Sequence, residues 1–212
     1  MWVVKLGGSL LGSPELARWL EVLVKFSDGK VVIVPGGGLF ADAVREAQQL
    51  SKTSDAVAHK LAVIAMDQFG LLLAGMNPAL ATASSELEIA ECGWQHRGIV
   101  WLPSKMVLAD DTIPKNWQAT SDSLSAWLAS KLDAEQLILV KSKPLTAYSK
   151  LAQIPLQKLV EDELIDSQFE DFTSGRNYQT WVLNKADCSL FEQGLSLQKL
   201  EENGLLVNMG SY

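Results

Sequence analysis

Two glycine-rich segments in this chain of 212 residues have the composition of anion-binding loops. One short apolar run ends in glycines within the segment Val3-Val4-Lys5-Leu6-Gly7-Gly8-Ser9. A second run ends in glycines within the segment Val34-Pro35-Gly36-Gly37-Gly38. Because glycine has no Cβ, backbone N–H groups can approach an anion closely there, and they form a phosphate cradle when a helix follows. Neither segment matches the Walker A loop or Gly-x-Gly-x-x-Gly. A tight strand-to-helix turn is the alternative explanation for either segment taken alone.

Lys5 is the feature that favours an anion site over a plain turn. Its neighbours Val3, Val4 and Leu6 are apolar, as expected of a strand covered on both faces. A lysine in such a strand is costly unless its ammonium group reaches an anion at the strand end. The alternative is a lysine at the rim of the sheet that extends its ammonium group into water.

The hydrophobic periodicity predicts alternating strands and helices along most of the chain. A strand at 2–6, a helix at 14–26 and a strand at 30–34 make one βαβ unit with parallel strands. The further elements expected are helices at 40–50, 55–74, 120–132, 155–160, 166–172 and within 188–202, and strands at 98–102, 136–140, 178–183 and 204–207, the last at a sheet edge.

This pattern predicts an α/β fold, a three-layer αβα sandwich around a mostly parallel sheet. In such sheets, ligands bind outside the carboxyl ends of the strands, where both glycine segments lie. The helix at 55–74 is expected to bury Val57, Leu61, Ile64, Ala65 and Leu72. The segment 103–119 has no clean period and is expected to be irregular.

The bulk composition restricts the classes of function. With 48% hydrophobic and 20% charged residues, the chain suits a single domain over 1–212. A formal charge of −7 argues against nucleic-acid and anionic-membrane partners. No run approaches the roughly 18 apolar residues of a membrane span. Cys92 and Cys188 form no metal-binding or disulfide pattern, which indicates reduced thiols and, with the absence of a secretory leader, a cytoplasmic protein.

Three motifs in this order resemble the amino acid kinase superfamily, which includes N-acetylglutamate, carbamate, uridylate and isopentenyl phosphate kinases. They are Lys5-Leu6-Gly7-Gly8-Ser9, Val34-Pro35-Gly36-Gly37-Gly38 and Thr120-Ser121-Asp122-Ser123-Leu124-Ser125-Ala126-Trp127-Leu128-Ala129, and the last precedes the strand 137–140. The similarity covers roughly residues 1–141. It implies the carbamate kinase-like fold and an ATP-dependent phosphoryl transfer with Mg²⁺ bound to ATP.

The resemblance also implies roles for residues on the nucleotide side, the half at 120–212 together with the first glycine loop. Lys5 would stabilise the transferring phosphoryl group, and Gly7, Gly8 and Ser9 would donate hydrogen bonds to it. Asp122 would orient the active-site lysines by ion pairing. Such a division suits phosphoryl transfer, which requires mainly positioning and positive charge or N–H donors at the phosphoryl oxygens.

On the acceptor side, the half at 1–119, the second glycine loop would bind the substrate. By the same resemblance, Gly36, Gly37 and Gly38 would hold the phosphate or carboxylate of the acceptor at the start of the next helix. Ser121, beside Asp122, is assigned to the phosphate-binding residues. Members of this fold often pair through helices of the amino-terminal half, so a homodimer or larger homo-oligomer is expected.

The chain departs from the family pattern at two places. Many members carry Thr-Asp after the strand that corresponds to 137–140, and later a Gly-Gly-Met-x-x-Lys segment that supplies a second catalytic lysine. Here Lys141-Ser142-Lys143 follows the strand, and the second motif has no counterpart. Lys141 as a catalytic residue and Lys143 as a phosphate ligand are the replacements considered, with Arg176 as a further candidate. A protein that binds nucleotides or anions without catalysis is the alternative.

A closer resemblance is to the short (5-(aminomethyl)furan-3-yl)methyl phosphate kinases of methanofuran and tetrahydromethanopterin pathways. It rests on the segments 54–62 and 65–70 and on the chain length. Asp55 and His59 lie one helical turn apart, and we expect Asp55 to pair with the acceptor amine and His59 to contact its phosphate. A capping aspartate beside an exposed histidine is the alternative. The resemblance predicts a phosphorylated acceptor, and a carboxylate such as an amino acid derivative is the enzymatic alternative.

Overall fold

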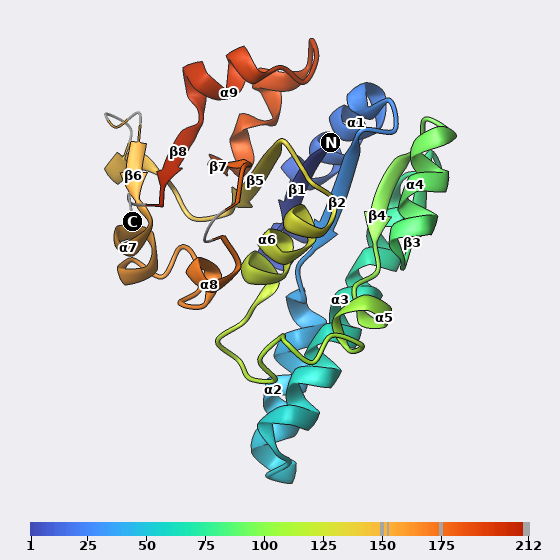
Figure 1. Cartoon of the computed structure of the whole chain (residues 1–212), viewed down its shortest axis with the longest axis vertical. Coiled ribbons are helices and arrows are strands. Elements are labelled where there is room, and N and C mark those ends of the chain that lie inside the picture. The colour runs from blue at the N-terminus through green and yellow to red at the C-terminus, as the bar shows by residue number, and fades with distance from the viewer. Residues whose placement is uncertain (149–150, 152, 174–175, 210–212) are drawn as a thin grey trace.

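The computed structural model describes residues 1–148, 151, 153–173 and 176–209. Within these residues, one eight-stranded sheet runs in the order β3-β4-β2-β1-β5-β7-β8-β6 (Figure 1). The strands are β1 (Trp2–Leu6), β2 (Val31–Pro35), β3 (Leu80–Ala83), β4 (Gly98–Trp101), β5 (Gln136–Lys141), β6 (Gln153–Pro155), β7 (Gln179–Asn184) and β8 (Leu205–Asn208). The glycine-ended strands β1 and β2 are neighbours at the centre, so their carboxyl ends meet.

The sheet is parallel except at one end, where β8 pairs antiparallel with β7 and parallel with β6. The predicted mostly parallel αβα sandwich is therefore confirmed. The expectation that 204–207 forms an edge strand is wrong, because β8 has a partner on each side. The pattern analysis missed the edge strands β3 and β6. Their sequences, Leu-Ala-Thr-Ala and Gln-Ile-Pro, are too short and too poor in β-branched residues to indicate strands on their own.

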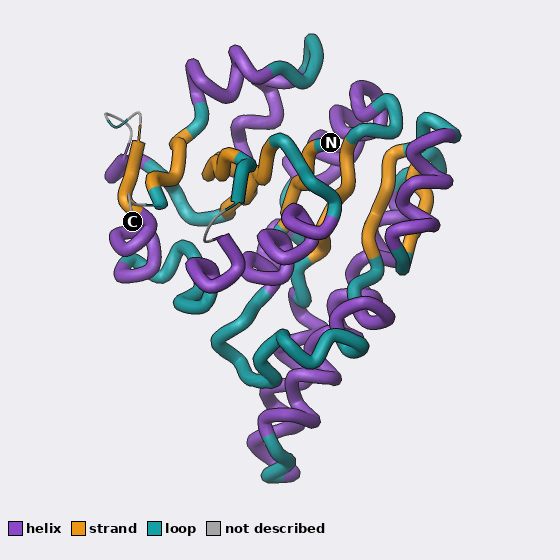
Figure 2. The backbone as a smooth tube through the Cα atoms, viewed as in Figure 1, coloured by secondary structure: helices purple, strands orange, loops and turns teal. Residues whose placement is uncertain are grey.

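Helices cover both faces of the sheet, as Figure 2 shows for the strands lying between them. They are α1 (Pro14–Ser27), α2 (Gly38–Ser51), α3 (Asp55–Met76), α4 (Glu86–Trp94), α5 (Ser104–Val107), α6 (Ser121–Lys131), α7 (Leu156–Glu161), α8 (Phe169–Thr173) and α9 (Leu197–Asn203), with the 3₁₀ helices η1 (Gly8–Leu10), η2 (Thr146–Tyr148) and η3 (Lys185–Phe191). Apart from α5 and the turns around it, the segment 103–119 is irregular, as predicted.

The alternation of side chains along β1 decides where its lysine lies. Val4 and Leu6 point into the core shared with α1, whereas Val3 packs into the core on the α6 face. Successive strand residues face opposite sides of a sheet, so Lys5 shares the face of Val3. The sequence therefore directs the lysine toward α6.

Helix α3 buries a different face from the one predicted. Val57, Leu61 and Leu72 are 46%, 41% and 38% exposed, and Ala65 alone of the predicted set is fully buried. The helix lies alongside α2, and the two extend together below the sheet (Figure 1). By length and mean hydropathy alone α3 could cross a membrane, although Lys60 and Asp67 interrupt it, so it is not the uninterrupted apolar run that the chain was expected to lack. However, 44% of its most apolar window is buried inside the protein, as in a core helix.

The two glycine loops lie in direct backbone contact. A Cβ on Gly8 would lie 2.0 Å from the Cα of Gly38, and a Cβ on Gly36 would lie 2.6 Å from the nitrogen of Gly8. Gly38 also has a φ of +54°, a backbone angle that residues other than glycine rarely adopt. Close approach of the two strand ends is therefore one physical reason why both loops lack side chains.

Gly8→Ala is expected to destabilise the fold, because the new methyl group would overlap the backbone of the second loop. We expect the free energy of unfolding to fall by about 1–3 kcal/mol in a denaturant titration. Gly7→Ala is the matched control, since its Cβ would lie at an ordinary 3.4 Å from the nearest atom. Equal stability of the two variants would show that the loops do not need this close approach.

Candidate functional site

The site is organised around Asp122, which bridges two buried lysines. Its Oδ1 lies 2.9 Å from the Nζ of Lys5, and its Oδ2 accepts a hydrogen bond of 2.7 Å from the Nζ of Lys141. The parallel register of β1 and β5 pairs Lys5 with Leu139, so Lys141 lies two residues farther along on the same face. All three side chains are at most 10% exposed. The structure thus brings together the three residues assigned to catalysis from the sequence.

The charges in this cluster do not balance. Two ammonium groups face one carboxylate, which leaves one excess positive charge in a buried position. Burial opposes the ionisation of Asp122, but Lys141 and Lys5 together lower the pKa of its carboxyl to about 2. Burial lowers the pKa of Lys141 to about 8, with Asp122 opposing this shift and Lys5 adding to it. A buried excess charge is costly, and an anion bound next to it would offset the cost.

The ammonium group of Lys5 forms an ion pair with Asp122 that lacks hydrogen-bond geometry. Although the two form an ion pair, Oδ1 of Asp122 accepts no hydrogen bond within the described part of the chain. A Cβ on Gly7 would lie 3.5 Å from the Nζ of Lys5, so the backbone of the first glycine loop passes close to the ammonium group. Protons of Lys5 therefore remain available for an anion held by this loop.

A second carboxylate holds the start of α6 in position. Asp166 accepts hydrogen bonds from the backbone nitrogens of Thr120 and Ser123, at 3.1 and 3.0 Å, and from the hydroxyl groups of both residues. These N–H groups belong to the first turn of a helix, where no partner exists within the helix itself. By capping α6, Asp166 fixes the helical turn that carries Asp122. Sequence analysis missed this residue, because Asp166 lies more than forty positions away along the chain.

Two cavities are lined in part by the first glycine loop. The smaller, of about 210 Å³, is lined by Asp122, Lys141 and Lys143 and by residues of the loop. The larger, of about 530 Å³, is lined by both glycine loops, by α2 and α3, by the segment before α6 and by its first residues. Lys5, Gly7 and Ser9 border both cavities. A group held at Lys5 would therefore lie at the border of both cavities.

Most of the residues predicted from the sequence line these cavities. Lys143 borders the smaller one and Ser121 the larger. Arg176, the further candidate for a second cation, lines a separate pocket beside Trp127 and is not among the residues around Asp122.

The glycines of the second loop differ in what their N–H groups do. The N–H of Gly36 donates to the carbonyl of Leu6 at 2.9 Å, continuing the strand pairing, so it is not available to a ligand. Gly37 and Gly38 lead into α2, whose first N–H groups have no partner within the helix. Among the three glycines, only Gly37 and Gly38 therefore suit the predicted role as donors.

His59 and Asp55, predicted together, are separated by the fold. His59 lines the larger cavity, is 4% exposed and shares a hydrogen bond of 3.1 Å between its Nδ1 and the carbonyl of Asn116. Burial lowers the pKa of its imidazole, opposed by that carbonyl. Asp55 is exposed, accepts a hydrogen bond from Gln48 and is not among the described residues that line the cavity. The structure thus brings only His59 of this pair to the cavity.

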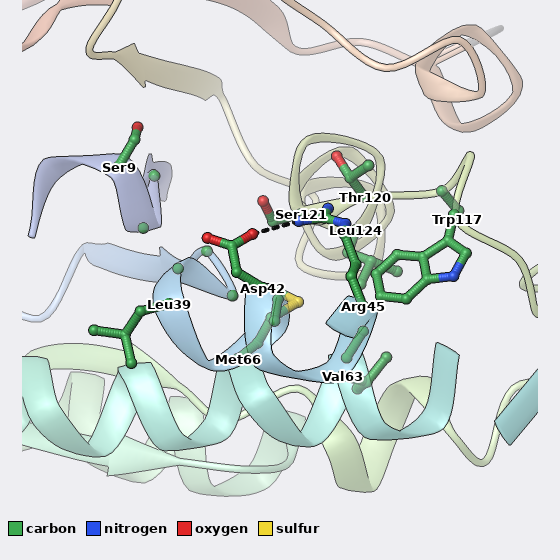
Figure 3. Close-up of a pocket in the computed structure, with 18 of the residues that line it drawn as sticks. Ser9, Leu39, Asp42, Arg45, Val63, Met66, Trp117, Thr120, Ser121 and Leu124 are labelled. Carbon is green, nitrogen blue, oxygen red and sulfur yellow. Dashed lines mark hydrogen bonds and ion pairs between the residues drawn. The ribbon is translucent and has the colours of Figure 1, made fainter. Parts of the chain in front are cut away.

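Asp42 and Arg45 on α2 are cavity residues that the sequence analysis did not identify. Figure 3 shows both side chains rising from α2, with Trp117 beside Arg45. Arg45 Nη1 lies 2.6 Å from Asp42 Oδ1, and its guanidinium lies 4.8 Å from the centre of the Trp117 ring. Trp117 comes from the irregular segment before α6. The only sequence signal for Asp42 was its position one turn after Gly38 on the predicted helix.

Comparison with known sequences agrees with this arrangement, in which glycine loops and buried lysines meet at the ends of parallel strands. The model of the amino acid kinase family matches residues 1–175. The chain belongs to this family. A relative from Methanocaldococcus jannaschii, named [5-(aminomethyl)furan-3-yl]methyl phosphate kinase, is 34% identical over 145 residues. The match covers 66% of this chain and 64% of the relative, so about a third of the relative's length lies outside it.

Solved structures with the same fold are kinases of nucleotides and amino acids. Uridylate kinase from Archaeoglobus fulgidus superimposes with a TM-score of 0.66 at 18% identity, covering 97% of each chain. UMP kinase from Bacillus anthracis gives 0.70 at 13% identity, covering 99% of this chain and 96% of that one. At such low identity these likenesses establish the fold, and they confirm the amino acid kinase fold expected from the sequence.

Asp122→Asn is expected to lower the pKa of Lys141 further below about 8, because the carboxylate opposes the loss of its proton. A pH titration of the folded variant, followed by NMR of labelled lysine side chains, measures this change. Asp111→Asn is the control: Asp111 is 92% exposed and pairs with Lys115 on the surface, so the pKa of Lys141 should stay the same. An unchanged or raised pKa in Asp122→Asn would contradict the electrostatic role given to Asp122.

Proposed function

We propose that this protein is an ATP-dependent kinase that transfers the γ-phosphoryl group to a small phosphorylated acceptor. The observation that carries the proposal is the buried cluster of Lys5, Asp122 and Lys141, with its excess positive charge between two cavities. Phosphoryl transfer needs positive charge at the moving group and an open approach from both donor and acceptor sides. In this proposal the smaller cavity receives the ATP phosphates, and the larger one receives the acceptor.

The residues of the cluster would act through position and charge. Lys5 and Lys141 would neutralise charge on the transferring phosphoryl group, and Asp122 would keep both ammonium groups in place. An oxygen of the acceptor phosphate would form the new bond to the γ-phosphorus as the bond from that phosphorus to the β,γ-bridging oxygen breaks. The products would be ADP and a diphosphate ester. In this proposal, Lys141 replaces the second catalytic lysine that the Gly-Gly-Met-x-x-Lys segment supplies in many family members.

ATP and Mg²⁺ fit the chemistry of the smaller cavity. Lys143, Lys141 and the N–H groups of the first glycine loop suit a phosphate chain, and Ser121 lies on the acceptor side of the same helix start. When bound, ATP would supply the phosphoryl group, and Mg²⁺ would neutralise negative charge on its phosphates. Within the described residues no group of three His, Cys, Asp or Glu side chains could hold a metal, so we propose that ATP itself supplies most metal ligands. We expect such an enzyme in the cytoplasm.

For the acceptor, we propose [5-(aminomethyl)furan-3-yl]methyl phosphate, an intermediate in methanofuran-type cofactor synthesis. The relative of that name supports this choice, as does a cavity with helix N–H donors at Gly37 and Gly38 beside Lys5. His59 lines the same cavity. Because burial keeps its imidazole neutral near pH 7, we propose that it contacts the acceptor as a hydrogen-bonding group without charge.

The test is turnover of the purified protein with ATP, Mg²⁺ and a panel of acceptors, followed as ADP and product by mass spectrometry. We expect the aminomethylfuran phosphate to be converted to its diphosphate. Lys5→Met, which keeps the length of the side chain without its charge, should lower kcat at least a hundredfold, because one cation that stabilises the transition state is lost.

The same assay separates the alternative functions. Turnover of an N-acetylated amino acid in place of the phosphate ester would identify a carboxylate kinase. ATP binding without turnover of any acceptor would indicate a binding protein. Full activity of a folded Lys5→Met enzyme would contradict the proposed site itself.

We further propose that the protein forms a homodimer through α3. Val57, Leu61 and Leu72 form an exposed apolar stripe along this helix, together with Leu71 and Met76. At about 100° per residue these five side chains share one face of the helix, in two groups on either side of the exposed Gln68. A second copy of the same surface is a self-complementary cover for it.

Leu61→Glu is expected to convert the dimer to a monomer, because it places a charge at the centre of the stripe. Light scattering on a sizing column measures the mass. Leu87→Glu is the control, since Leu87 is 84% exposed on α4 and lies outside the stripe. A wild-type protein that is monomeric at micromolar concentration would contradict the dimer without affecting the proposed kinase activity.

A further inference from the structure

We propose that Asp42 binds the ammonium group of the acceptor and so selects aminomethyl substrates. The inference rests on the proposed function and assigns a specificity role within the same cavity. It replaces Asp55, which the sequence pattern favoured, with a carboxylate that the structure brings into the cavity lining.

Asp42 is the one carboxylate among the described residues that line the larger cavity. It lies four residues after Gly38 on α2, which corresponds to a rise of about 6 Å along the helix. The start of α2 offers N–H donors to an anion, and Asp42 offers a negative charge one turn later.

The contacts of Asp42 leave one of its oxygens free for a ligand. Oδ1 accepts from Arg45, whereas Oδ2 accepts no hydrogen bond from the residues that the structure describes. Arg45 is itself held over the ring of Trp117, whose Nε1 donates to Gln48 at 2.7 Å. These contacts on one side orient the carboxylate. Figure 3 shows it on the cavity side of α2, opposite Ser121.

Apolar side chains make up a further part of the lining of the larger cavity. Leu39, Val63 and Met66 line it from α2 and α3, and Leu124 lines it from α6. The cavity therefore combines cationic and N–H donors at the glycine loops, apolar side chains and one carboxylate. This combination suits a molecule that carries a phosphate, a flat ring and an amine.

Arg45 is the competing cation, and it defines what the experiment must distinguish. If Asp42 served only to position Arg45, and Arg45 bound an anionic part of the acceptor, loss of the carboxylate would affect every phosphorylated acceptor equally. If Asp42 binds the ammonium group, the loss would be confined to acceptors that carry an amine. A pair of acceptors that differ only in the amine therefore separates the two roles.

The experiment compares wild type and Asp42→Asn on [5-(aminomethyl)furan-3-yl]methyl phosphate and on the analogue with a methyl group in place of the aminomethyl group. For Asp42→Asn, we expect the KM of the amine substrate to rise about tenfold to a hundredfold, the loss expected for one charge-assisted hydrogen bond. The KM of the methyl analogue should change less than threefold. Glu46→Gln, one turn farther along α2 and outside the cavity lining, should leave both values unchanged.

The outcomes separate this inference from the proposed function. An equal rise in KM for both acceptors would contradict the ammonium site at Asp42 without affecting the proposed kinase activity. An unchanged KM for both acceptors would have the same consequence. If the wild-type enzyme does not convert the amine substrate, the proposed function fails first. Calorimetric binding of both acceptors to the wild type and to Asp42→Asn then tests Asp42 without turnover, and loss of the preference for the amine would be the expected result.

Discussion

The ion triad of Lys5, Asp122 and Lys141 is the interaction on which the rest of the site depends. Removing three charged groups from water costs several kcal/mol per ion unless their geometry is precise. The structure supplies this precision with the most rigid parts of the fold: two neighbouring parallel strands hold the lysines, and the first turn of α6 holds the carboxylate. The capping of α6 by Asp166 belongs to the same construction, because it fixes the turn that carries Asp122.

The glycine loops lie next to the excess positive charge of the triad. The loops lie in contact at Gly8 and Gly38, so their lack of side chains is first a packing requirement between two strand ends. The same contact places bare N–H groups around an ammonium group that is only partly satisfied by its aspartate. The packing of the strand ends and the anion binding that we propose would therefore both result from one arrangement, so a tight turn and a phosphate cradle are compatible explanations.

The sequence was informative where the local signal was strong. The central strands β1, β2, β4 and β5 are apolar runs bounded by turn residues, and all were predicted with boundaries within two residues. The edge strands β3 and β6 were missed because pairing with a neighbour, and not their own composition, makes them strands. The buried face of α3 was also predicted wrongly. Its sequence is apolar around most of its circumference, so periodicity alone does not show which side meets the sheet and α2.

The sequence by itself determined the fold class, the family and the types of groups at the strand ends, because strand alternation and short motifs are local properties. It also supplied Lys5, Asp122 and Lys141 as candidates. Only the tertiary structure decided that both lysines meet the same carboxylate, since this follows from the register of β1 against β5. The proposal of Asp42 over Asp55 likewise depends on the tertiary structure, because both carboxylates are exposed but only Asp42 is among the described residues that line the larger cavity.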